Sequence, residues 1–214
     1  GSGSLVSLPM LIFLGLPATV ANGTNRVGVL VQGVVSAGIF RSKGILDVRK
    51  GLGLAAPAVV GGLLGARIAV NIDENVMEQV IGALMVVMLL VILVRPRRWL
   101  EDRQGDAQRK LGWVKTLVLF VIGVYGGFIQ AGVGIFLMSV LVLAGNIGLV
   151  RANALKVLIV LCFTAFALVV FVAHGQVDWF IGMLLAVGNA GGAWLAARLA
   201  IERGAAFVRW CLIV

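Results

Sequence analysis

Two polar stretches inside apolar segments of this chain carry the same kinds of side chain. The first contains Asn22, Asn25 and Arg26, and the second, 131 residues further along, contains Asn153 and Lys156. Residues three or four positions apart share one face of a helix, so each stretch would place an amide beside a cation. The cation supplies charge and the amide a directed donor, a combination that suits the binding of a small anion.

The depth of the two cations favours a functional role. Arg26 lies about eight residues into its apolar segment, roughly 12 Å along a helix, and Lys156 lies about seven residues into its own. A charged side chain at the bilayer centre costs ~2.5–3.5 kcal/mol on insertion scales and usually serves a ligand or a transport route. Two alternatives stay open: the long stems could reach back to the lipid headgroups, and the amides could join neighbouring helices.

The composition indicates an integral membrane protein. Hydrophobic residues make up 61% of the chain and charged residues 13%, whereas soluble domains have an apolar share near 45–50%. The apolar segments are about 20 residues long, which suits helices that cross a ~30 Å hydrocarbon core. The net charge of +9 comes from Lys and Arg between these segments, not from one amphipathic face. We therefore expect the lipid bilayer, and not nucleic acid, as a partner.

An internal repeat extends beyond the two polar stretches. At the same offset of 131 residues, Gly44 matches Gly175 and Asp47 matches Asp178. The sequence predicts a first transmembrane repeat over 1–95, a basic cytoplasmic linker over 96–112 and a second transmembrane repeat over 113–214. We expect the first repeat to lack the counterpart of 112–131 and the second to stop before its last helix is complete. Many secondary transporters consist of two such halves with a polar site between them.

The distribution of Lys and Arg favours halves of opposite orientation. Residues 41–50 contain four cations and their counterpart none, whereas 67–76 contain one and their counterpart three. Cytoplasmic loops collect Lys and Arg, and inverted halves place 15 of the 18 cations on that side. Inversion requires an odd number of crossings per half. We therefore predict an all-α, polytopic helical bundle in a bacterial inner membrane. It is built from two duplicated, inverted halves, each with about three crossing helices and one glycine-broken re-entrant or discontinuous segment.

Glycines mark the predicted breaks. The apolar segment 115–144 is too long for one comfortable crossing and is rich in glycine at its centre. Broken half-helices expose backbone N–H groups that attract anions. The candidate substrate-binding positions therefore also include Gly1, Gly3, Gln130, Gly132 and Gly134. Small residues can also serve only to let helices pack closely.

No set of residues for catalysis or for holding a cofactor stands out. Cys162 and Cys211 lack the spacing of a metal or redox pair, and His174 is alone, with no Ser, His and Asp set at a recognisable spacing. We therefore expect no enzyme activity, cofactor or metal. The scarcity of His and carboxylates inside the apolar segments also argues against a cation permease and against coupling to sodium or protons.

Several motifs resemble those of the sulfite exporter TauE/SafE family, also called toluene sulfonate uptake permeases. The resemblance covers essentially the whole chain. It rests on the glycine turn before Leu-Pro-Met-Leu at 8–11, on Ala-Asn-x-x-Asn-Arg-Val at 21–27, on Gly-Ala-Arg-Ile-Ala at 65–69 and on Gly-Gln-Val-Asp-Trp at 175–179. The turn at 132–135 departs from the longer glycine run that the family often has, which leaves its geometry and the substrate open. The resemblance implies transport of sulfite, sulfoacetate or other sulfonates.

The resulting hypothesis is a permease that exports a small sulfur-containing anion through a midplane site between the halves. Arg26 and Lys156 would supply charge, and Asn22, Asn25 and Asn153 would supply directed donors. One alternative is a different anion. Another is a non-transporting membrane scaffold or receptor, in which both cations would point to the lipid headgroups.

Overall fold

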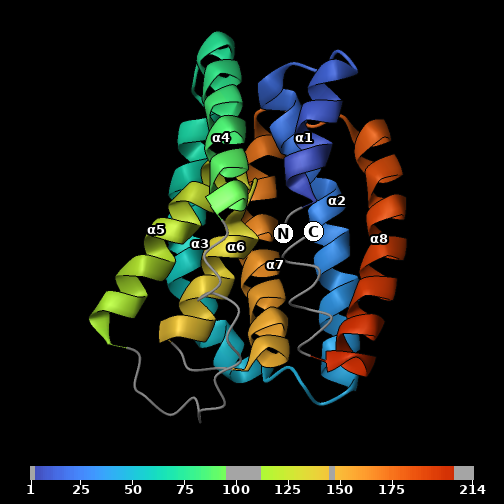
Figure 1. The fold of residues 1–214 in the computed structure, drawn as a ribbon. Helices are drawn as coiled ribbons and strands as arrows, with labels where there is room; N and C mark the ends of the chain where they lie inside the picture. Colours follow the sequence, from blue (N-terminus) through green and yellow to red (C-terminus); the bar gives the residue numbers. More distant parts are fainter. Residues whose placement is uncertain (1–2, 95–111, 145–147, 205–214) are drawn as a thin grey trace.

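The computed structural model describes residues 3–94, 112–144 and 148–204, and every regular element in these ranges is helical (Figure 1). The elements are α1 (Ser4–Phe13), α2 (Ala18–Ser42), α3 (Val48–Val70), α4 (Glu74–Val94), α5 (Trp113–Ile129), α6 (Val133–Ser139), the short π-helical continuation η2 (Val140–Ala144), α7 (Leu149–Ala173) and α8 (Trp179–Glu202).

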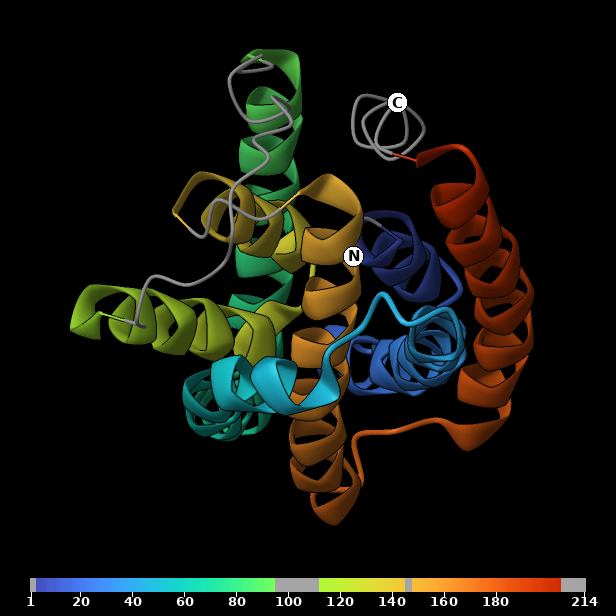
Figure 2. The same cartoon turned by 90° about the horizontal axis from the view of Figure 1, so that it is seen from below.

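The helices run roughly parallel to one another, between an upper and a lower end as drawn in Figure 1. From mid-height, α1 rises to the upper end, α2 descends, α3 rises and α4 descends. In the second half, α5 rises from the lower end to mid-height, α6 and η2 return downward, α7 rises and α8 descends. The α5–α6 hairpin therefore enters and leaves at the same end of the molecule. Viewed from below, α7 lies near the centre, with α8 beyond α2 on one side and α5 on the other (Figure 2).

Membrane-crossing length is reached by three described helices that are also apolar enough, namely α3, α7 and α8. The 25 residues of α2 equal the length of α7. Its lower hydropathy has a local cause, because it carries the polar run from Asn22 to Arg26 in its first half. The fold is therefore an all-helical bundle with several membrane-spanning elements.

The turns that join α2 to α3 and α7 to α8 are built alike. Each contains a glycine with positive φ, at Gly44 (φ 68) and Gly175 (φ 69), where a side chain would be strained. Each ends in an aspartate cap: Asp47 accepts the Lys50 N–H at 3.1 Å, and Asp178 accepts the Ile181 N–H at 3.0 Å. The same Lys50 N–H bond lowers the pKa of the Asp47 carboxyl below its ordinary value.

The hairpin arm α5 packs against α3 through glycines on both helices. A Cβ added at Gly61 or Gly65 of α3 would overlap backbone atoms of α5, and one added at Gly123 or Gly127 of α5 would overlap backbone atoms of α3. The two main chains thus approach each other directly, as small residues allow in membrane helices. This packing fixes the position of the upper end of α5, where the hairpin turns.

The long apolar segment is interrupted where its glycines are concentrated. The first helix ends at Ile129 with Gln130 as its C-cap, and α6 begins after Gly132, whose φ of 75 is in the left-handed region. Glycine adopts this conformation without the steric cost that other residues bear. The turn leaves the last carbonyl groups of α5 without partners inside their own helix.

Candidate functional site

Arg26 lies in the interior of the molecule and contacts the end of the broken helix. Its side chain is fully buried. Nη1 donates to the carbonyl oxygen of Gly126 at 3.2 Å, and Nη2 donates to those of Gly127 at 2.5 Å and Phe128 at 3.4 Å and to the Asn22 amide oxygen at 3.5 Å. These carbonyls form the C-terminal end of α5, where a helix carries partial negative charge. The guanidinium therefore caps α5 from another helix.

The charge of Arg26 is not balanced by a carboxylate in the described part of the chain. Within those residues the printed ion pair is Lys50 with Asp47, at the surface. The Arg26 guanidinium instead stacks over the Phe171 ring of α7, with 4.6 Å from its central carbon to the ring centroid. Its Nε–H has no partner among the described atoms. A buried cation with a free donor and no counter-ion attracts an anion.

The two asparagines on α2 have different contacts. The Asn22 amide nitrogen donates to the Phe128 carbonyl oxygen at 2.7 Å, so it supports the same hairpin end as Arg26. Asn25 faces α1: its amide oxygen accepts the Ser7 hydroxyl at 2.6 Å, and its amide nitrogen donates to the Ser4 hydroxyl at 3.1 Å. Both asparagines are buried. Asn22 and Arg26 therefore form one site, and Asn25 connects that site to α1.

Gln130 occupies the turn of the hairpin and faces α7. Its amide nitrogen donates to the Thr164 hydroxyl, and its amide oxygen has no partner among the described atoms. Both side chains are buried. Of the predicted glycines nearby, Gly132 forms the left-handed turn and Gly134 lies buried in α6. The hairpin turn thus brings Gln130, Gly132 and Gly134 to the same region as Asn22 and Arg26.

The second cation lies elsewhere. Lys156 and Asn153 are half-buried on α7, and neither makes a hydrogen bond or ion pair with residues that the structure describes. Phe171, which stacks on Arg26, is 15 residues further along the same helix, a distance of about 22 Å at 1.5 Å per residue. The two cations therefore lie at different heights and do not converge on one ligand in this conformation. Gly3 is exposed at the start of α1, and Gly1 lies outside the described residues.

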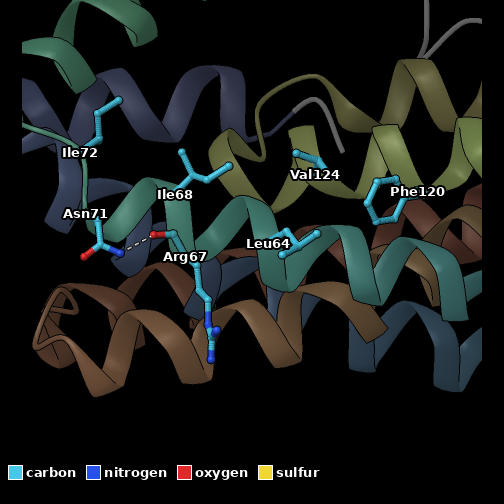
Figure 3. Close-up of a pocket in the computed structure, with 7 residues that line it drawn as sticks. All are labelled: Leu64, Arg67, Ile68, Asn71, Ile72, Phe120 and Val124. Atoms are coloured by element: carbon cyan, nitrogen blue, oxygen red, sulfur yellow. Dashed lines mark hydrogen bonds between the residues drawn. The ribbon is translucent and has the colours of Figure 1, made fainter.

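Neither described cavity contains the predicted site. A groove of about 710 Å³ lies between α3 and α5 and is mostly apolar; in Figure 3 the Arg67 side chain points away from Phe120 and Val124. Asn71, at one end of this groove, donates to the Arg67 carbonyl at 2.7 Å. An apolar cavity of about 470 Å³ lies between α4 and the α5–α6 hairpin. Arg26 is thus closed off from both, and a solute would reach it only after a conformational change.

Sequence reasoning missed the partners of these side chains. Thr164 and Phe171 lie in an unbroken apolar run, where nothing in the spacing singles them out. Ser4 and Ser7 precede the polar stretch and were not connected to Asn25. The carbonyl groups at the end of α5 belong to the main chain and have no signature in residue type.

Comparison with known proteins provides the family. The description of the sulfite exporter TauE/SafE family matches residues 1–214. The chain belongs to the sulfite exporter TauE/SafE family. It is 26% identical over 219 residues to a probable membrane transporter protein, ORF9, of Sinorhizobium sp, covering all of this chain and 81% of that protein. It is 27% identical over 217 residues to probable membrane transporter proteins of Haemophilus influenzae and of Escherichia coli K12 (YfcA), covering 100% of this chain and 83% and 79% of those proteins. No solved structure matches the chain.

Family membership identifies the class of activity. The relatives are described as probable membrane transporters, and the apolar helices of this chain fit a membrane environment. The TauE/SafE chain studied here is therefore a membrane transporter, which points away from an enzyme and implies a small-molecule substrate and a lipid surround.

Proposed function

We propose that this TauE/SafE chain is a permease that exports a small sulfur-containing oxyanion, such as sulfite or a sulfonate, across a bacterial inner membrane. The observation that carries the proposal is the buried, unbalanced charge of Arg26 with its free Nε–H. The family description, which names sulfite export, supports the choice of anion and direction. The absence of a metal-binding group of His, Cys, Asp and Glu among the described residues fits the same choice.

We further propose that the two halves are inverted repeats. In support, α2 and α7 have equal lengths and begin 131 residues apart, and so do the starts of α3 and α8. The members of each pair run in opposite directions in Figure 1, and so do α1 and α6. On this proposal the α5–α6 hairpin is the re-entrant segment, residues 1–95 and 113–214 are the repeats, and 96–112 is the linker.

The charges at the two ends support a cytoplasmic lower end. The α2–α3 turn, the start of α5, the start of α7 and the end of α8 lie there in Figure 1. Their described cations are Arg41, Lys43, Arg49, Lys50, Lys115, Arg151, Arg198 and Arg203. The upper end has Arg67 together with the acidic residues of the α3–α4 turn. This asymmetry is the one expected when Lys and Arg stay on the cytoplasmic side.

Lys156 and Asn153 form a second station on the transport route in this proposal. Lys156 has no hydrogen-bond partner in the described chain, so its charge is available to an anion approaching from the lower end, where α7 begins. An anion would then pass toward Arg26 when the hairpin turn moves. Alternating access of this kind, in which one half moves relative to the other around a polar site, is common for transporters with inverted repeats.

Export from proteoliposomes loaded with radiolabelled sulfite tests the proposal. Wild type should release the anion, Lys156→Gln should lose release because the charge is gone, and Lys156→Arg should retain most of it. Rubidium release measured in the same vesicles is the cation control. Equal sulfite release by Lys156→Gln and wild type would contradict the role of Lys156.

A non-transporting scaffold is the second candidate, and one observation favours it. The bonds from Arg26 to three carbonyls are what a purely structural helix cap would show. A scaffold predicts no anion release above that of protein-free vesicles, in wild type or in any variant.

A further inference from the structure

The start of α2 binds a carboxylate that comes from another helix. One carboxylate oxygen of Glu74, the first residue of α4, accepts the N–H of Ala18. The other accepts the Thr19 N–H at 3.3 Å and the Thr19 hydroxyl at 2.6 Å. The residue before α2 is Pro17, which provides no side-chain cap. Glu74 therefore fills the helix N-terminus, where unpaired N–H groups and the helix dipole favour negative charge.

This carboxylate lies at the end of the polar stripe that leads to Arg26. Ala18, Asn22 and Arg26 are spaced by four residues, and Thr19 is three residues before Asn22, so all four share one face of α2. From Thr19 to Arg26 the distance along the helix is about 10 Å. Ala18, Thr19, Asn22 and Arg26 are all buried. An anion that enters from the upper end along this face would meet the Glu74 position first and Arg26 second.

The donors that hold Glu74 are those that a small oxyanion would use. Two backbone N–H groups and a hydroxyl bind sulfur or phosphorus oxyanions as readily as they bind a carboxylate. Arg26 gives an independent indication of a ligand on the same stripe, because its buried Nε–H has no partner among the described atoms. The chain thus occupies, with its own carboxylate, a subsite that continues into a cationic site.

We propose that Glu74 is a competing internal anion that excludes substrate from the outer subsite at Ala18 and Thr19 until its carboxylate leaves. This inference rests on the proposed function, since the subsite matters only if anions travel along the stripe to Arg26. Glu74 sets how tightly an anion is held at the upper end. Export to that side benefits, because the returning carboxylate displaces the departing anion.

Binding of sulfite to the purified protein, measured calorimetrically at fixed pH, tests the role of Glu74. Glu74→Gln keeps the shape but removes the competing charge, so the apparent dissociation constant should fall about tenfold, the scale of a partly buried charge at a helix N-terminus. Glu78→Gln is the matched control, because Glu78 is exposed one turn along the same helix, and its affinity should equal that of wild type. Unchanged or weaker binding by Glu74→Gln, the outcome for a purely structural cap, would overturn the proposal.

A second measurement keeps this inference separate from the proposed function. If wild type and Arg26→Gln show no sulfite binding, the proposed function fails, and Glu74 is then tested with thiol reagents alone. In a background without Cys162 and Cys211, Asn22→Cys is reacted with an anionic and with a neutral methanethiosulfonate. Glu74→Gln should raise the ratio of anionic to neutral reaction rates about tenfold. An unchanged ratio, or no reaction in either background, would refute exclusion by Glu74.

Discussion

Replacing Arg26 by Gln should destabilise the protein strongly, whereas replacing Lys156 by Gln should not. Arg26 donates to the carbonyls of Gly126 and Gly127 at 3.2 and 2.5 Å, and the shorter glutamine side chain cannot keep both bonds. A hydrogen bond to a charged group contributes about 1.5–3 kcal/mol, so two of them contribute about 3–6 kcal/mol. Removing the charge also removes the cost of burying it, so we expect a net loss of about 3 kcal/mol, at the lower end of that range.

The expected shift in thermal midpoint follows from the size of the chain. For proteins of about 150–250 residues, a loss of 1 kcal/mol lowers the midpoint by about 2–4 °C, so Arg26→Gln should lower it by about 6–12 °C. The measurement is intrinsic fluorescence during heating in detergent, since the chain has five Trp residues. Lys156→Gln is the control, because Lys156 has no hydrogen bond to lose among the described residues. Its midpoint should change by less than about 2 °C.

Stability and export together separate structural from transport roles. On the proposed function, Arg26→Gln loses both stability and sulfite export, whereas Lys156→Gln loses export at unchanged stability. Arg26→Lys should be intermediate in stability, because an ammonium keeps the charge but not the planar fork of donors. Equal midpoints for Arg26→Gln and wild type would refute the assignment of Arg26 as the cap of α5.

Three further predictions concern packing, orientation and energy coupling. Gly65→Ala and Gly123→Ala should each cost about 1–3 kcal/mol in unfolding free energy by forcing α3 and α5 apart; Gly53→Ala, where nothing lies within 4 Å of the added Cβ, should not destabilise, and equal melting of all three would contradict the packing. Single cysteines at His174 and Lys43, in a background without Cys162 and Cys211, should react with an impermeant thiol reagent from opposite sides; labelling of both from one side would contradict inverted halves. Export should follow membrane potential, which contributes ~2.3 kcal/mol per charge per 100 mV, and should ignore sodium at fixed voltage and pH; flux that collapses without a sodium or proton gradient, in vesicles clamped with potassium and valinomycin, would reveal a coupling site.

The sequence was sufficient for features that arise from residue type and periodicity. Apolar composition predicted a helical membrane protein, and the family resemblance is confirmed by the match over the whole chain. The glycines around 123–134 marked the position of the helix break, which the structure places at Gln130–Gly132. These predictions succeeded because hydropathy and glycine content act locally, within one segment of the chain.

Contacts between distant segments could not be predicted in the same way. The partners of Arg26 are main-chain carbonyls 100 to 102 residues away, and any residue type would provide them. The capping of α2 by Glu74 joins residues 55 and 56 positions apart and depends on how α4 packs. The separation between Arg26 and Lys156 likewise follows from the relative heights of α2 and α7, which a residue offset does not contain.

The double engagement of Arg26 links anion binding to movement of the hairpin. A guanidinium has five N–H donors, and in the described conformation Nη2 alone contacts three acceptors, two of them at 3.4 and 3.5 Å. An anion at the free Nε–H would form a charge-assisted bond and draw the weaker of these contacts away from Phe128 and Asn22. The carbonyl end of α5 would then lose part of its cap just as the anion arrives. Because binding and tip release share one side chain, each must favour the other by the same free energy, which is the coupling that a transporter of this design requires.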